Sequence, residues 1–133
     1  MVPLLKYSLI DTKGIIIDAK SGTTGAGRSL KLGSLYCSVN ESFKAYGVAC
    51  HRHTPEIEQI YSEYAGEDVV IQFTPHLLPV DRGILATCYA QLKEGVTDAQ
   101  IEEAYQTMYG KEFFIRLRGK GGCPELKNVR ASN

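Results

Sequence analysis

The sequence predicts an α+β fold in which a mixed, mainly antiparallel sheet carries helices on one face. Three short runs rich in β-branched and other apolar residues, at 15–19, 69–76 and 82–92, have the composition of strands. Two other segments, after Thr54 and after Thr97, repeat apolar residues at helical spacing. We therefore expect 69–76 and 82–92 to pair in one sheet, with both helices packed through their apolar stripes.

The first half of the chain contains one clear strand. Residues 3–9 are typical of the last turn of a helix, and a turn at 11–14 follows. The isoleucine-rich run at 15–19 is predicted to be a buried strand that leads into a glycine-rich loop at 21–28. Between 29 and 46 the apolar spacing is partly helical, but glycine and several serines weaken it.

Both predicted helices have recognisable ends. Thr54 is a suitable N-cap for the first helix, and Gly66 is placed to end it in a left-handed conformation. Thr97 and Gln100 form a capping-box pattern ahead of the second helix, which should end at Gly110.

Two more strands are expected near the C-terminal end. At 113–118 the residues Phe113, Ile115 and Leu117 should face one way and the two arginines at 116 and 118 the other, which predicts a strand with one apolar face. A last strand is predicted to begin at 128–131.

Composition indicates one globular domain over residues 1–133. An apolar fraction of 44% with 23% charged residues is ordinary for a domain with a real core. Net charge is zero, which argues against bulk attraction to nucleic acid or to a membrane surface. We see no secretory segment and no apolar run of membrane-spanning length, so we expect a cytoplasmic protein. The cysteines, without metal-binding spacing, are then expected to be reduced thiols: Cys37, Cys50, Cys88 and Cys123.

The densest chemistry lies at 50–59, where two histidines flank an arginine directly before a predicted helix. If 48–53 is extended, His51 and His53 point to the same face. Both would then stand ahead of the positive end of the helix dipole, where anions are held.

Three interpretations of this histidine pair remain open. It is a strand-to-helix junction with two half-buried imidazoles, or a metal site completed by Glu56 or His76. The third interpretation is an acid–base and anion site, in which Arg52 binds carboxylate or phosphate. From the residue types alone, the first and third interpretations are about equally favoured.

The glycine-rich loop at 21–28 is the second candidate for function. Its glycines permit close approach to a ligand, successive N–H groups can form an anion-binding nest, and Arg28 adds a fixed charge. The pattern is neither GxGxxG nor a P-loop. A plain mobile linker is the alternative, but a strand before it and an arginine after it favour an ordered, ligand-facing loop.

Three further observations belong together: the blocks SGTTGAGR at 21–28, HRHTPEI at 51–57 and FTPHLLPVDRGILATC at 73–88. These blocks resemble the N-acetyl-gamma-glutamyl-phosphate reductases of the aspartate-semialdehyde dehydrogenase superfamily. They occur in the family's order, and the resemblance covers essentially the whole chain. It implies a substrate-binding and dimerisation domain of the glyceraldehyde-3-phosphate-dehydrogenase C-terminal type, forming a homo-oligomer through its sheet.

The chain also departs from the family pattern. It contains no strand–GxGxxG–helix unit, and no cysteine stands in the Pro-Gly-Cys-Tyr context of the family nucleophile. We therefore expect an excised domain that lacks the dinucleotide-binding domain and the C-terminal segment, is inactive alone, and carries Cys50 as a structural thiol. A stand-alone interaction or ligand-binding domain of the same fold is the alternative.

The resemblance implies a reaction in arginine biosynthesis that converts N-acetyl-gamma-glutamyl phosphate to N-acetylglutamate semialdehyde with NADPH. A thiolate expels phosphate, a hydride follows, and the tetrahedral centre must then gain a proton and collapse, which suits a histidine. His53 is the first choice for this role and His51 the second. The further implied roles are Arg52, Arg28 and Arg82 for the substrate's carboxylate or phosphate, Glu56 for orienting an imidazole or binding the substrate amide, and Ser21, Gly22 and Gly25 for the cofactor.

Overall fold

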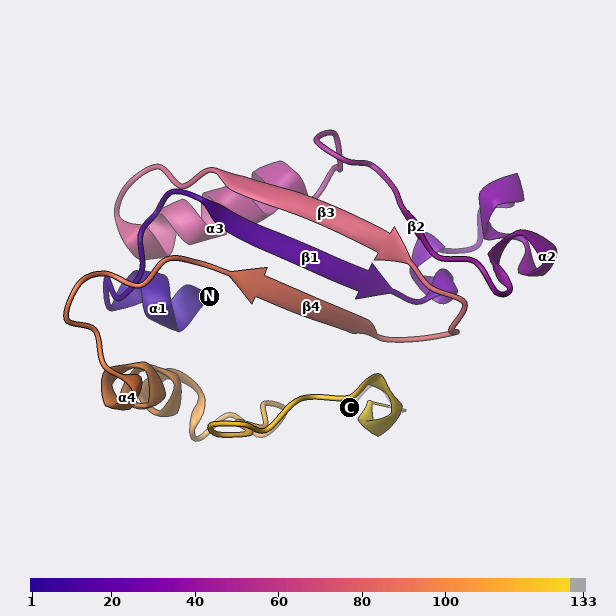
Figure 1. Ribbon diagram of the computed structural model, residues 1–133. Helices are drawn as coiled ribbons and strands as arrows, with labels where there is room; N and C mark the ends of the chain where they lie inside the picture. The colour runs from indigo at the N-terminus through magenta and orange to yellow at the C-terminus, as the bar shows by residue number, and fades with distance from the viewer. Residues whose placement is uncertain (130–133) are drawn as a thin grey trace.

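A four-stranded sheet with the strand order β2–β3–β1–β4 forms the centre of the computed structural model, which describes residues 1–129 (Figure 1). The central pair β1 and β3 is parallel, whereas β1–β4 and β2–β3 are antiparallel. The sheet is therefore mixed with two antiparallel pairings out of three, and the predicted α+β class is confirmed. The strands are β1 (Ile15–Ser21), β2 (Lys44–Ala45), β3 (Ile71–Leu77) and β4 (Ile84–Tyr89).

The strand order corrects one expectation. The segments predicted as strands at 69–76 and 82–92 both enter this sheet, but β1 lies between them, so they do not pair directly. The isoleucine-rich strand β1 is central because its neighbours satisfy both of its backbone edges and its Ile15, Ile17 and Ala19 side chains are buried on one face.

Three helices supply the cover for that buried face: α1 (Val2–Lys6), α3 (Thr54–Ala65) and α4 (Asp98–Tyr109). Leu5 of α1 and Ala104 of α4 share one core with Ile15 and Ile17, and Tyr61 of α3 packs against the same core. Helices on one face were expected, and this arrangement confirms it. The remaining helical turns are α2 (Tyr36–Val39) and three 3₁₀ segments, η1 (Thr23–Ala26), η2 (Leu32–Ser34) and η3 (Leu126–Asn128).

The predicted helix ends are correct at three positions. Gly66 ends α3 with φ of 73°, Gly110 follows the last residue of α4, and Thr97 forms the full capping box with Gln100. The predicted N-cap of α3 is wrong by one residue. His53 caps the helix, because its carbonyl already accepts the Ile57 N–H at 3.0 Å.

The strand predicted at 113–118 does not form. Phe113 and Phe114 are 80% and 65% exposed, and the backbone there makes a turn in which the Ile115 N–H donates to the Glu112 carbonyl. A segment with alternating apolar residues forms a strand only when it can hydrogen-bond to the edge of another strand. Here the chain at 116–124 runs along α4 instead of along a strand. Of the last strand, predicted to begin at 128–131, Asn128 instead ends the 3₁₀ segment η3, Val129 belongs to no strand, and residues 130 and 131 lie outside the described part of the chain.

The opposite face of the sheet has no helix against it within residues 1–129 (Figure 1). Strand alternation places Ile16, Asp18 and Lys20 of β1 on this uncovered face, and the register adds Thr74 and His76 of β3. The side chains of β4 on the same face are Leu85, Thr87 and Tyr89. Among the helices of residues 1–129, none combines the length and apolar character needed to cross a bilayer.

Candidate functional site

The two histidines of the motif lie together at the start of α3. Their ring centroids are 5.0 Å apart with the planes at 74°, and the His53 backbone N–H donates to His51 Nδ1 at 3.3 Å. The predicted extended backbone over 48–53 is wrong, because Gly47 and Ala49 adopt positive φ and the segment forms turns. The turns, rather than the alternation of a strand, bring the imidazoles together.

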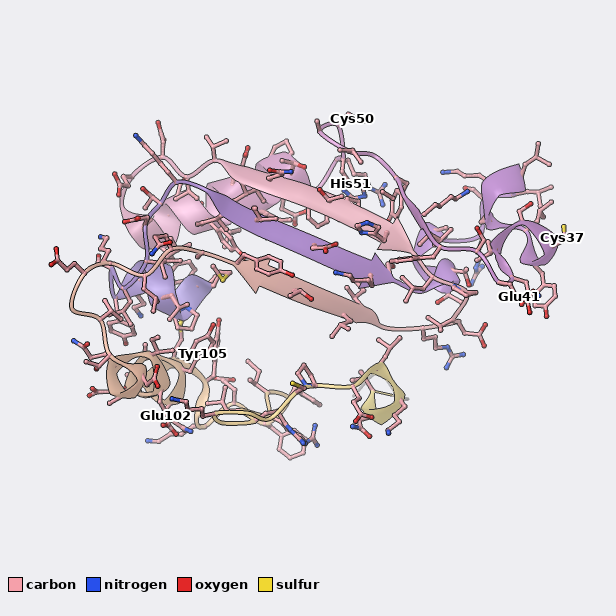
Figure 2. The ribbon with its side chains drawn as sticks, viewed as in Figure 1. Cys37, Glu41, Cys50, His51, Glu102 and Tyr105 are labelled. Atoms are coloured by element: carbon pink, nitrogen blue, oxygen red, sulfur yellow. The ribbon has the colours of Figure 1, made fainter. Side chains whose placement is uncertain are left out.

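His51 is the inner member of an aromatic cluster. Its ring meets Phe73 of β3 edge-on with a centroid distance of 5.1 Å, and Tyr46 at 5.6 Å. A Cβ added at Gly47 would approach the His51 ring to 3.1 Å, so the glycine lets the turn close over the imidazole. His51 lies beneath the loop that carries Cys50 (Figure 2).

The environments of the two imidazoles differ. His51 is half-buried, and burial, followed by the neighbouring His53 and Arg52, lowers its pKa below the usual value. Since its Nδ1 accepts a hydrogen bond, the neutral ring carries its proton on Nε2. His53 is exposed and stands at the N-cap of α3, where its ring is open to a ligand.

The start of α3 adds charged and polar groups to this pair. Arg52 and Glu56 are exposed on either side of the cap. The Thr54 hydroxyl is buried and makes no hydrogen bond within the described residues, which leaves a spare polar group at the first helical position. The guanidinium and the positive helix end both favour an anion here.

The glycine-rich loop is ordered, as predicted, but it is not an anion nest. Ser21 ends β1, and the chain continues into η1. The N–H groups of Gly22, Thr23 and Thr24 donate to carbonyls of the β3–β4 connection, and Gly25 N–H donates weakly to Gly22 at 3.4 Å. Consecutive amides that are already bonded within the protein do not form the predicted nest.

The arginines predicted for substrate binding are accessible. Arg28 and Arg82 are both exposed. Arg82 lies in the β3–β4 connection, where the flanking Asp81 and Gly83 carbonyls accept hydrogen bonds from the glycine-rich loop, so the Arg82 backbone is held next to that loop. Within the loop Ser21 is half-buried and its hydroxyl donates to the Gly22 carbonyl, whereas Gly25 is exposed.

Strand β3 connects the histidine pair with the glycine-rich loop. Phe73 touches His51, the Tyr46 N–H donates to the Pro75 carbonyl at 3.0 Å, and the Leu78 N–H donates to the Ser21 carbonyl at 2.9 Å. β1 and β3 are parallel and pair as far as their last residues, Ser21 and Leu77. The glycine-rich loop after β1 therefore begins at the same end of the sheet as the connection that follows β3.

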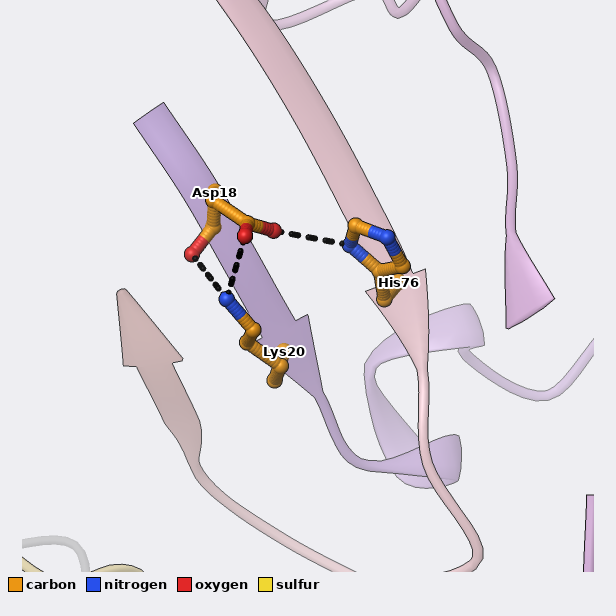
Figure 3. A network of polar contacts seen from close by, with 3 residues as sticks. All are labelled: Asp18, Lys20 and His76. Atoms are coloured by element: carbon orange, nitrogen blue, oxygen red, sulfur yellow. Dashed lines mark hydrogen bonds and ion pairs between the residues drawn. The ribbon is translucent and has the colours of Figure 1, made fainter. Parts of the chain in front are cut away.

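A polar network that sequence reasoning missed lies on the uncovered face (Figure 3). Asp18 pairs with Lys20 at 2.6 Å, and its Oδ1 lies 3.0 Å from His76 Nδ1, within ion-pair distance of a protonated imidazole but without the alignment of a hydrogen bond. The Lys20 hydrogen bond, then the charges of Lys20 and His76, lower the Asp18 pKa. The available sequence signal was that Asp18 and Lys20 are two residues apart in a strand-forming segment. The third member of the network, His76, is distant in sequence and could not be connected to them.

The metal-site interpretation receives no support from the geometry. His76 extends from the opposite face of β3 to Phe73, which contacts His51, so it does not join the histidine pair. Among residues 1–129 no three His, Cys, Asp or Glu side chains gather closely enough to hold a metal ion. All four cysteines are free thiols.

Comparison with known proteins reveals a match over the full chain. Residues 1–133 match the family described as "Semialdehyde dehydrogenase, dimerisation domain". The chain is 56% identical over 133 residues to N-acetyl-gamma-glutamyl-phosphate reductase of Pelotomaculum thermopropionicum and 53% identical over 131 residues to that of Lachnoclostridium phytofermentans. These alignments cover 100% and 98% of this chain but 38% of each relative, so the chain spans well under half of their length.

Proposed function

Because the chain belongs to the semialdehyde dehydrogenase dimerisation-domain family, we propose that it is the substrate-binding and dimerisation part of an NADPH-dependent N-acetyl-gamma-glutamyl-phosphate reductase. The observation that carries this proposal is the histidine pair at the start of α3, in a chain more than half identical to proteins of that name. The reaction is the reduction of an acyl phosphate to an aldehyde.

His53 is proposed as the acid–base residue and His51 as its partner. The His51 ring is held by Phe73 and Tyr46 and by the hydrogen bond from the His53 backbone. Because its ring is held in place, His51 is suited to orienting the substrate, with its Nε2–H available to donate a hydrogen bond to it. The exposed His53 ring is free to exchange a proton with the reacting oxygen.

The anionic substrate is proposed to bind between the segment that carries the histidine pair and the glycine-rich loop. Arg52 stands beside the histidines, while Arg28 and Arg82 are exposed near the glycine-rich loop, so each can reach a carboxylate or phosphate. Glu56, one turn into α3, is proposed to orient an imidazole or to accept from the substrate amide.

NADPH is proposed to be bound mainly outside this chain and to supply a hydride. Ser21, Gly22 and Gly25 are proposed to face its nicotinamide. The Gly22 amide is already donated to Gly83, so contact at that position is by packing against the loop. The exposed Gly25 provides the open backbone that a flat ring can approach.

The uncovered face of the sheet is proposed to bind a second copy of the chain. Ile16 and Tyr89 on this face are 37% and 54% exposed, beside a shallow hollow that they form with Asp18, Thr74 and His76. Apolar groups around a polar centre are typical of a surface that becomes buried by association.

A hybrid enzyme tests the catalytic part of the proposal. This chain replaces the matching segment of the Pelotomaculum thermopropionicum reductase, and the hybrid is expected to reduce the acyl phosphate. His53→Asn should then lower kcat by about 10²- to 10⁴-fold, the usual contribution of positioned acid–base catalysis, with cofactor affinity unchanged. His51→Asn should cost less and should raise KM more than it lowers kcat.

Gln59→Asn is the control, because Gln59 is an exposed polar residue farther along α3 and the change keeps its amide. It should leave both kinetic constants within twofold. An inactive unmodified hybrid would overturn the proposed function, and a His53→Asn hybrid with near-normal kcat would overturn the role of His53.

The 133-residue chain alone provides a second test. It should show no NADPH-dependent reductase activity, because none of its cysteines stands in the nucleophile's sequence context. Activity of this chain by itself would contradict the proposal and would make Cys50, next to His51, the candidate nucleophile.

A further inference from the structure

The glycine-rich loop at 21–28 and the β3–β4 loop at 78–83, which lie at the same end of the sheet, are joined by pairs of hydrogen bonds. The Thr23 N–H and Oγ1 both donate to the Val80 carbonyl, at 2.9 and 3.2 Å. In the same way the Thr24 N–H and Oγ1 both donate to the Asp81 carbonyl, at 3.1 and 2.6 Å. Two consecutive threonines therefore bind two consecutive carbonyls, each with both its backbone and its side chain.

Gly22 allows this contact to form. Its N–H donates to the Gly83 carbonyl at 2.9 Å, and an added Cβ would lie 2.8 Å from the Asp81 oxygen and 2.9 Å from the Arg82 nitrogen. Its φ of −70° and ψ of 162° suit any residue, so the requirement for glycine comes from the close approach of the second loop rather than from backbone conformation.

These bonds go beyond what the sheet itself requires. Strands β1 and β4 are already joined in register up to Ser21 and Ile84, which fixes the two ends of the loops. The threonine hydroxyls lie past that point and add donors to carbonyls that the threonine amides already satisfy. Their effect is to hold the glycine-rich loop against the residue that precedes Arg82.

We propose that Gly22, Thr23 and Thr24 are positioning residues, which join the loop at 21–28 and the loop at 78–83 into one unit that holds Arg82 beside the glycine-rich loop for binding the anionic substrate. This inference rests on the proposed function for its substrate, but the union of the two loops is tested separately. We call the set of contacts made by Gly22, Thr23 and Thr24 the loop clamp.

Amide hydrogen exchange on the 133-residue chain tests the clamp itself. Thr24→Val keeps the shape and the backbone amide but removes the hydroxyl. A hydrogen bond contributes about 1 kcal/mol, so exchange at the amides of residues 22–24 should rise about fivefold. Exchange at Ile17 and Phe73, in the middle of β1 and β3, should stay unchanged. Thr24→Ser, which restores the hydroxyl, should return the rates to those of the unaltered chain.

Gly22→Ala tests the close approach with a matched control. The new methyl group must push the Asp81 backbone away, so exchange should rise in both loops. Gly33→Ala is the control, because a Cβ at Gly33 meets only the flexible end of the Lys44 side chain, at 3.3 Å. If Gly22→Ala and Gly33→Ala gave equal exchange in the two loops, the clamp would be overturned.

The hybrid reductase tests whether the clamp positions the substrate. Thr24→Val should raise KM for the acyl phosphate about fivefold with a smaller change in kcat, and Thr24→Ser should restore KM, as expected when one hydrogen bond of about 1 kcal/mol holds a binding group. Thr107→Val, at an exposed position of α4, is the control and should leave KM unchanged.

The possible failures are distinct. Faster exchange with an unchanged KM would overturn the positioning role, because the clamp would then serve structure alone. Exchange that does not respond to Thr24→Val would overturn the clamp. An unmodified hybrid without activity would overturn the proposed function, while the exchange data would still decide whether the loops move as one unit.

Discussion

Replacing Ile16 with threonine should weaken self-association of the chain without unfolding it. Ile16 lies on the central strand β1 with its side chain on the uncovered face, next to Tyr89 of β4. Threonine is also β-branched and suits a strand, so the change removes apolar surface while preserving the backbone preference. The prediction follows from the proposal that a second copy covers this face.

The magnitude follows from the exposure of Ile16. Complete burial of an isoleucine side chain is worth about 1.5–3 kcal/mol. Since 37% of Ile16 is exposed, covering that remainder contributes about 0.6–1.1 kcal/mol. A twofold-symmetric dimer makes each contact twice, which gives about 1.1–2.2 kcal/mol, or a rise of about 6- to 40-fold in the dimer Kd.

Sedimentation equilibrium over a range of concentrations measures this Kd, and circular dichroism verifies that the monomer remains folded. Ile84→Thr is the matched control, because Ile84 is a strand residue 66% exposed on the opposite, helix-bearing face. Its Kd should stay within twofold of the unaltered chain. A weaker dimer in Ile84→Thr but not in Ile16→Thr would place association on the other face, and a chain that stays monomeric at high concentration would refute the reasoning.

Three further predictions concern stability, each measured by chemical denaturation. Thr97→Ala should lower the free energy of unfolding by about 1 kcal/mol, because it removes the capping box with Gln100, and an unchanged value would mean that the cap contributes nothing. Leu5→Ala should cost about 2–5 kcal/mol, because Leu5 is only 2% exposed in the core, and a loss below 1 kcal/mol would contradict that packing. The lowered pKa of His51 means that the unfolded chain binds the proton first as the pH falls, so stability should decrease below about pH 6.5 and level off beneath the folded-state pKa. His51→Gln should remove that part of the decrease, and a pH profile identical to that of the unaltered chain would contradict the assignment.

Sequence reasoning succeeded where the signal is local. The β-branched run of β1 and the helical stripes of α3 and α4 each depend on neighbours within a few residues, and so do the caps at Gly66 and Thr97. The segment at 113–118 has an equally regular pattern, but a strand also needs a partner edge, and periodicity contains no information about that edge.

The candidate site shows the same division. The histidine pair was predictable because His51 and His53 are two residues apart, although the turns that join them depend on positive φ at Gly47 and Ala49. Phe73, which supports His51, was seen only as part of a strand.

The contacts that order the glycine-rich loop were hidden for a related reason. Thr23 and Thr24 donate to carbonyls 57 residues away, at Val80 and Asp81, so no local sequence pattern predicts these hydrogen bonds. The sequence therefore predicted an ordered loop correctly but assigned its free amides to a ligand, when the fold had already bonded them to the protein.

The alternation of side chains along β3 separates assembly from chemistry. Phe73 points to the helix-bearing face and touches His51, whereas Thr74 and His76 point to the uncovered face beside Asp18. One strand therefore supports the candidate site with one set of side chains and the proposed subunit contact with the other. A dimer formed through the uncovered face would restrict the motion of β1 and β3. Because the loops of the candidate site follow these two strands, the dimer would also restrict the motion of those loops. Substitutions such as Ile16→Thr should accordingly affect the histidine pair only through assembly and not through contact.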